Sequence, residues 1–309
     1  MINRALIRLK VVQIVYAYYQ NSGRNIDIAE KELFFSLSKA YDLYNYLLDL
    51  MVEVTSYANK QIEKKKHKFE PTADELAPSM KFVNNKFILQ LKSNKQLLSF
   101  IESQKANWSN ETEIVKVVYN KIIESDAYRE YMASEGETSY AEDRELWRKL
   151  YKQVILNNDE LESMLEDLSL YWNDDKEIVD TFVIKTIKRF EESNGADQPL
   201  LPQFKDEEDK EYASRLFRRA LLNIDYYRDL INKQVKNWDL DRVAFMDVIV
   251  MQIALAEILS FPNIPISVSL NEYVEIAKFY STAKSPSFIN GTLDGIVNQL
   301  KKDNKLTKN

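Results

Sequence analysis

The sequence contains no cysteine, one histidine and only five glycines in 309 residues. Without cysteine the chain forms no disulfide and offers neither a thiolate nucleophile nor a cysteine-bound zinc. The single histidine, His67, lies in a run of lysines and cannot build a multi-histidine metal site. Neither GxGxxG nor GxxxxGK[ST] occurs, so the dinucleotide and P-loop patterns are absent. These absences exclude most cofactor and thiol enzymes and leave carboxylate chemistry open.

Long apolar runs are also scarce. The most apolar segment, 243–261, contains Asp247, Gln252 and Glu257, and a spanning helix would place two carboxylates in lipid. We therefore interpret it as a buried helix of a soluble protein. The amino terminus has no apolar segment of signal-peptide type, which favours a cytoplasmic location.

Helical periodicity dominates what is present. Apolar residues recur at three- and four-residue steps from Leu33 to Met51, which predicts one long helix over about 30–60. Thr72 with Glu75, and Ser139 with Glu142, have the spacing of capping boxes that begin helices. No segment has the alternation of a strand, so the predicted fold class is all-α.

Further helices are expected on both sides of one break. The break is 195–209, where two prolines and an acidic run interrupt the pattern. Pro286 suits the first turn of a helix, where its missing N–H costs nothing. The expected helical ranges are 80–104, 112–133, 159–172 and 175–192 before the break, and 209–236, 239–260, 268–282 and 285–301 after it.

Four segments carry the only specific motif in the chain. They are Ile253–Leu259, Ile264–Pro265, Asn271–Lys278 and Ser287–Asp294, in that order. Their order and spacing resemble the NusB family of transcription antitermination factors, with the pattern "AxxEL … IP … NEAVELAK … KFVNGVLD". The amino terminus is similar to the first helix of that family, at Arg4, Arg8, Gln13 and Tyr16.

The resemblance implies two packed helical bundles opened by an insertion. It covers about the first 24 residues and residues 209–309. The expected division is 1–60 for amino-terminal NusB-like helices, 61–205 for an acidic helical insertion and 206–309 for the carboxy-terminal NusB-like domain.

Charge separates these parts of the chain. Residues 1–24 carry +4 and residues 209–309 carry +2, whereas residues 25–208 carry −12. The family-like parts are therefore basic, as a phosphate-contacting protein should be. We expect the acidic insertion to add no RNA surface.

The resemblance also implies a function without catalysis. NusB proteins bind the boxA segment of nascent RNA together with NusE, a small-subunit ribosomal protein, and act on the RNA polymerase elongation complex during ribosomal RNA transcription. No cofactor, metal or catalytic residue is expected. The residues that would bind single-stranded RNA are Arg4, Arg8, Lys10, Gln13, Tyr16, Lys284, Phe288 and Asn290.

Two further positions are expected to face NusE, namely Asp247 and Gln252. An acidic residue suits a basic ribosomal protein. The family often has an arginine where this chain has Gln252, and an acid where it has Lys284. RNA binding by this chain is therefore expected to depend more on NusE than it does in other members of the family.

Some residues have a structural interpretation as well. Gly291 and Gly295 lie four residues apart in an expected helix, where each glycine costs about 1 kcal/mol relative to alanine, so close helix packing is the first explanation. The aromatic residues of the insertion are expected in a core rather than on a binding surface. They are Tyr128, Tyr131, Tyr140, Trp147, Tyr151, Tyr171 and Trp172.

Three alternatives stay open. A NusB-like domain attached to a ribosomal RNA cytosine methyltransferase is disfavoured, because this chain has no cysteine nucleophile. A helical carboxylate metalloenzyme is disfavoured by the absence of Glu-x-x-His pairs. A protein-interaction adaptor that keeps the NusB-like fold but has lost RNA binding is the main rival.

Overall fold

The computed structural model describes residues 1–21, 25–104, 108, 111–235 and 243–308. Within these ranges the chain is helical, and the only bridge of β type is an isolated pair between Ile2 and Phe204. The predicted all-α class is confirmed. No helix in the described part of the chain is both long enough and apolar enough to span a membrane.

Contacts divide the chain into two units. Unit 1 comprises Met1 and Lys39–Gln203, and unit 2 comprises Ile2–Ser38 and Phe204–Asn309. Helix α2, Ile26–Lys66, is the predicted long helix and contributes its first turns to unit 2 and the remainder to unit 1. The units divide between Gln203 and Phe204, which lies inside the predicted break at 195–209. They also divide between Ser38 and Lys39, which lies before the expected boundary at residue 60.

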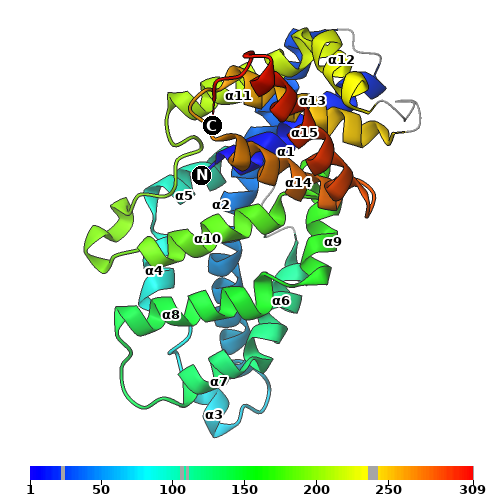
Figure 1. Cartoon of the computed structure of the whole chain (residues 1–309). Coiled ribbons are helices and arrows are strands. Elements are labelled where there is room, and N and C mark those ends of the chain that lie inside the picture. The colour runs from blue at the N-terminus through cyan, green and yellow to red at the C-terminus, as the bar shows by residue number, and fades with distance from the viewer. Residues whose placement is uncertain (22–24, 105–107, 109–110, 236–242, 309) are drawn as a thin grey trace. The chain divides into compact units, whose positions relative to one another are not determined.

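Unit 1 is built on the later part of α2, followed by a series of shorter helices (Figure 1). Several predicted helices are interrupted, for example at Ser125, whose hydroxyl caps the second of two shorter helices. The elements after α2 are α3 (Ala73–Leu76), α4 (Lys86–Lys92), α5 (Lys95–Ser103), α6 (Thr112–Glu124), α7 (Asp126–Ala133), α8 (Tyr140–Leu150), the π-helix η2 (Tyr151–Ile155), α9 (Asp159–Leu168), the 3₁₀-helix η3 (Leu170–Trp172), α10 (Lys176–Arg189) and the 3₁₀-helix η4 (Glu192–Asp197).

Side-chain caps fix where these helices begin. Both predicted capping boxes, Thr72 with Glu75 and Ser139 with Glu142, are confirmed. Two caps are buried asparagines that also join segments distant in sequence. Asn85 Oδ1 accepts from Ile88 N while its Nδ2 donates to Asp143 O, and Asn94 does the same for α5 and Gln198 O. A buried side chain that satisfies both the helix end and a distant carbonyl leaves no orphan polar group.

Aromatic side chains attach other segments to α2. The indole N–H of Trp108 donates to Tyr46 O and that of Trp172 donates to Lys39 O, both at 2.7 Å. Both rings pack edge-on against Tyr46, with centroid distances of 6.1 and 5.5 Å. The prediction that the insertion's aromatics form core is confirmed for the buried Tyr131, Tyr140, Trp147, Tyr151 and Trp172, whereas Tyr128 and Tyr171 are half-buried.

Unit 1 also buries ionisable groups. Lys176 Nζ donates to Asp180 Oδ2 at 2.8 Å and to the carbonyls of Ile155 and Leu156, which end the π-helix. Burial raises the pKa of Asp180 to about 6 despite Lys176. Asp49 on α2 is 4% exposed, and burial, followed by the charge of Glu53, raises the pKa of its carboxyl to about 7.

Unit 2 packs its helices around α13 (Figure 1). Twelve successive residues of α13, from Asp247 to Ile258, are buried, as expected for the most apolar run in the chain. Pro286 lies in the first turn of α15, as predicted. The elements are α1 (Arg4–Gln20), the start of α2, α11 (Glu207–Leu222), α12 (Ile224–Gln234), α13 (Phe245–Ser260), α14 (Ile266–Tyr280) and α15 (Ser285–Lys302).

Replacing Asp49 by asparagine should make unfolding less dependent on pH. A carboxyl with a raised native pKa binds its proton more tightly in the native state, so the wild type loses stability as pH rises from about 4 to about 7. Asp49→Asn should therefore raise the free energy of unfolding at pH 8 by roughly 1–3 kcal/mol and leave it little changed at pH 4.

Urea unfolding at pH 4, 6 and 8 measures this effect. Asp126→Asn serves as the control, because that carboxylate is 88% exposed. Parallel pH profiles for Asp49→Asn and the wild type would contradict the assignment.

Candidate RNA interface and the buried ion pair beneath it

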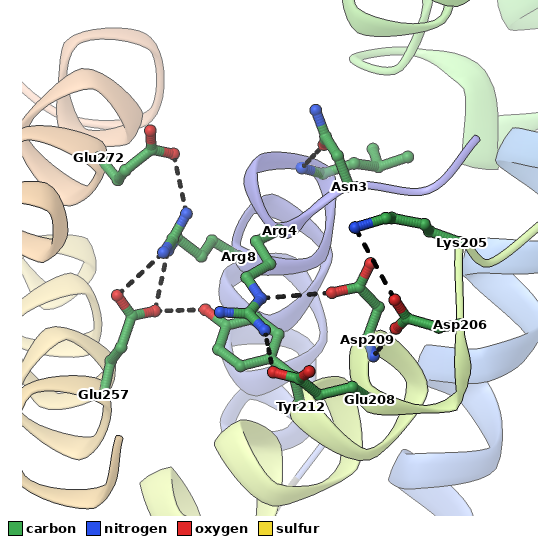
Figure 2. Close-up of polar contacts among 11 residues, drawn as sticks. Asn3, Arg4, Arg8, Lys205, Asp206, Glu208, Asp209, Tyr212, Glu257 and Glu272 are labelled. Atoms are coloured by element: carbon green, nitrogen blue, oxygen red, sulfur yellow. Dashed lines mark hydrogen bonds and ion pairs between the residues drawn. The ribbon is translucent and has the colours of Figure 1, made fainter. Parts of the chain in front are cut away.

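Arg8 is buried against a carboxylate rather than presented to solvent. Its side chain lies on α1 and is 4% exposed, and Nε and Nη2 donate to the two oxygens of Glu257 at 2.8 and 3.1 Å. Nη1 reaches Glu272 at 3.1 Å. Figure 2 shows Arg8 pointing from α1 toward these two acids.

Glu257 collects hydrogen bonds from several helices. Besides Arg8 it accepts from the hydroxyls of Tyr212, Ser269 and Tyr273, on α11 and α14. Burial by itself would raise the pKa of Glu257, but the hydrogen bonds and charge of Arg8 outweigh burial, and the pKa is lowered. The group is therefore an ionised carboxylate inside the core, held by a bidentate guanidinium.

Arg4 takes part in a second, more exposed set of ion pairs. Its guanidinium contacts Glu208 at 2.7 Å and Asp209 at 3.2 Å, and lies 5.0 Å from the ring centroid of Tyr212 (Figure 2). Its side chain is 33% exposed. Arg4 thus already has two anionic partners, with which a phosphate would compete.

Four of the predicted contact residues are buried, which corrects the expectation that they touch RNA or a protein partner directly. Arg8 and Lys10 are 3% and 2% exposed, and Asp247 and Gln252 are 4% and 0% exposed. Each lies on a helix that is covered on all sides, since residues 6–12 of α1 and 247–258 of α13 are all buried. A motif residue on such a helix can affect the surface only by holding the neighbouring helices in position.

Asp247 joins three elements of unit 2. Its carboxylate accepts from Ser285 Oγ at 2.8 Å and from Ser281 Oγ, at the turn between α14 and α15. Gln252 Nε2 donates to Tyr19 OH on α1 at 2.9 Å and to Ala220 O on α11 at 2.7 Å. These two side chains fix the start of α15 and the end of α1 relative to α13.

The remaining predicted residues lie toward the surface around these supports. Gln13 is half-buried and donates to Tyr280 OH at 3.0 Å, and Tyr16 is half-buried with its ring 5.8 Å from that of Phe245. At the start of α15, Lys284 and Asn290 are exposed and Phe288 is half-buried. We call the group Gln13, Tyr16, Phe245, Lys284 and Phe288 the candidate RNA face. Asn290 follows Phe288 by two residues, about 200° further round α15, and therefore lies on another side of that helix.

Two residues beside this surface, Tyr19 and Arg228, are not among those predicted from the sequence. Tyr19 lies 6.0 Å from Phe245, and the guanidinium of Arg228 lies 5.5 Å from the Tyr19 ring. Phe245 is 39% exposed, and Tyr19 is half-buried beneath Arg228. The sequence alone does not reveal these exposures, because they depend on the packed fold.

The two glycines of α15 have different surroundings. A Cβ at Gly295 would meet the side chain of Gln234 on α12, so packing explains this glycine. A Cβ at Gly291 would meet nothing within 4 Å, so the expected packing role does not extend to it. Lys284, Phe288 and Gly291 are spaced by four and three residues and share one face of α15.

Within the described residues no group of three or more His, Asp and Glu side chains is arranged to hold a metal ion.

Arg8→Ala should destabilise the protein strongly. It would leave the Glu257 carboxylate buried without its cation, which costs about 3–5 kcal/mol for a pair of this kind. Arg4→Ala should cost less than about 1 kcal/mol, because its pairs are partly solvated. Chemical denaturation of both variants tests this difference, and equal losses would contradict it.

Known proteins resemble this chain in sequence. The NusB family model matches residues 178–298, from α10 to α15. Three curated relatives are called transcription antitermination protein NusB. The protein of Salinibacter ruber is 35% identical over 41% of this chain and 82% of its own length. That of Natranaerobius thermophilus is 38% identical over 34% of this chain and 78% of its own length.

The third relative, from Chloroherpeton thalassium, is 40% identical over 32% of this chain and 47% of its own length. No solved structure matches the chain significantly. The matches cover most of two relatives, and the motif segments of α13, α14 and α15 lie inside the matched range. The chain therefore belongs to the NusB family.

Proposed function

We propose that this protein is a non-enzymatic antitermination factor that binds boxA-type single-stranded RNA together with NusE during ribosomal RNA transcription. Its relatives' names support the antitermination role. The observation that carries the RNA-binding part is the candidate RNA face, where half-exposed aromatic rings lie beside polar and cationic side chains.

The surface has the chemistry that unpaired bases require. Aromatic rings such as Tyr16 and Phe288 offer stacking platforms that tolerate any base. Lys284 supplies a positive charge for a phosphate. Asn290 is exposed on another side of α15 and is left out of this set. Arg4 would join this set only by exchanging one of its carboxylate partners for a phosphate.

The buried members of the motif position this surface. Asp247 holds Ser285, the residue after Lys284, and Gln252 holds Tyr19 at the end of α1. In our proposal NusE adds to the surface at the start of α13, beside the exposed Phe245, and the joined surface holds the RNA near the polymerase. Asp247 and Gln252 then act on the partner through the elements they hold.

Phe288→Ala should weaken binding of a fluorescent boxA RNA by about tenfold, because loss of one stacked base costs roughly 1–3 kcal/mol. Lys284→Gln should reduce the slope of log affinity against log salt by about 0.7, the value for one single-stranded phosphate. Anisotropy titrations with and without NusE measure both.

Two controls accompany these variants. Phe35→Ala removes another exposed aromatic of unit 2, and Lys301→Gln removes an exposed lysine from the last turn of α15. Absence of binding at low salt even with NusE would refute the RNA proposal and favour the adaptor that has lost RNA binding.

Gly291→Ala separates stability from binding. The open space around Gly291 and its mid-helix position predict a gain of about 0.5–1 kcal/mol in the free energy of unfolding. If RNA approaches the backbone here, the same variant should bind boxA RNA more weakly. Thermal unfolding and anisotropy on one preparation test both parts, and a stabilised variant with unchanged affinity would remove Gly291 from the face.

A further inference from the structure

The end of α2 carries a cluster of lysines that the function proposed above does not use. Residues 60–69 hold five lysines and one glutamate, and we call this segment the basic tip. Its lysines are Lys60, Lys64, Lys65, Lys66 and Lys68. The segment lies in unit 1, where the helix ends at Lys66 (Figure 1).

Only part of this charge is neutralised by neighbouring acids. Lys66 pairs with Glu63 at 2.8 Å, and Lys68 pairs with Glu75 of α3. Lys64 and Lys65 are exposed, and among the described residues neither has an ion pair within 4.0 Å. Two adjacent ammonium groups are thus available to an anion from solvent.

An uncovered aromatic ring follows directly. Phe69 is 99% exposed, the highest exposure among the large apolar side chains of the described residues. Leu76, on the helix tied to this tip by the Lys68–Glu75 pair, is 59% exposed. Lysines at a helix carboxy terminus are favoured by the helix dipole, which accounts for the cations but not for Phe69.

We propose that the basic tip is a second contact for single-stranded RNA, with Lys64 and Lys65 on phosphates and Phe69 stacked on a base. A cationic backbone track beside an exposed aromatic is the arrangement by which proteins hold unpaired strands regardless of sequence. The inference rests on the proposed function, since it extends the RNA held by this factor to the insertion. It also revises the expectation from net charge that the insertion adds no RNA surface.

The net charge of unit 1 does not reveal this basic segment, because the charges are unevenly distributed along the chain. Unit 1 has 22 Lys and Arg against 30 Asp and Glu, a net charge of −8. Residues 159–180 alone hold nine acids and one lysine, which is also −8, so the remainder of unit 1 is neutral overall. The adjoining Glu70, Asp74 and Glu75 lower the charge of residues 60–76 to +1, so the charge left for a ligand is that of Lys64 and Lys65.

The small extent of the tip favours RNA over an anionic membrane. A single strand needs only two or three phosphates at the tip. Lysines beside one aromatic ring match the alternating phosphates and bases of a single strand. Insertion of one phenylalanine into a lipid surface would contribute little binding free energy.

The test uses the full chain and a fluorescein-labelled oligouridylate of about 12 nucleotides. Lys64→Gln/Lys65→Gln should weaken binding about fivefold and lower the salt slope by about 1.4, or 0.7 for each phosphate. Phe69→Ser should weaken binding about fivefold or more with the salt slope unchanged, because stacking releases no counterion. A 4-thiouridine version of the probe should crosslink under ultraviolet light to a peptide within 60–76.

Matched controls come from the same unit. Lys149→Gln/Lys152→Gln removes two other exposed lysines, and Leu170→Ser removes a side chain that is 85% exposed. Both should bind the oligouridylate as the wild type does. Equal weakening by the controls, or unchanged affinity in both tip variants, overturns the proposal.

Parallel measurements separate this inference from the proposed function. If Phe288→Ala weakens oligouridylate binding while the tip variants do not, only the tip proposal fails. If the tip variants weaken binding and Phe288→Ala does not, the tip stands and the candidate RNA face fails. A different result would identify a membrane as the ligand of the tip and overturn the proposal. In that result the wild type sediments with phosphatidylserine vesicles, Phe69→Ser does not, and both bind RNA equally well.

Discussion

The carboxylate of Glu257 is the point at which four helices of unit 2 meet. Arg8 reaches it from α1, Tyr212 from α11, and Ser269 and Tyr273 from α14, while Glu257 itself belongs to α13. An ionised carboxylate in a core is tolerated only when its partners are in place, so each helix is held at the position that completes the set. The positions of these helices in turn set the positions of the side chains in the candidate RNA face.

The candidate RNA face depends on that buried arrangement. Its side chains come from α1, α13 and α15, which approach one another through buried contacts of Asp247 and Gln252. Removing either partner of the Asp247 contacts would leave a buried carboxylate unsatisfied, so these hydrogen bonds favour the observed packing. The family motif therefore contains residues that hold the helices in place as well as residues on the surface. Several of its polar residues are buried from solvent.

Unit 1 contains the buried ion pair Lys176–Asp180 and also uses neutral polar groups to join distant segments. Buried asparagines cap helices while bonding distant carbonyls, and the indole N–H groups of Trp108 and Trp172 bond carbonyls of α2. These side chains join segments that are distant in sequence. The unit's acidity is confined to a short stretch, so net charge says little about what any one of its surfaces can bind.

The sequence by itself determined the helical class, both capping boxes and the family, because these depend on local spacing and on motif order. Only the tertiary structure decided which motif residues face solvent. Arg8, Lys10, Asp247 and Gln252 lie on helices buried on every side, where no amphipathic stripe marks an inner face. Apolar neighbours on both sides of Arg8 and Lys10 were the one sequence signal of this burial. The partner of each buried charge lies far away in sequence, and only the packed fold brings the two together.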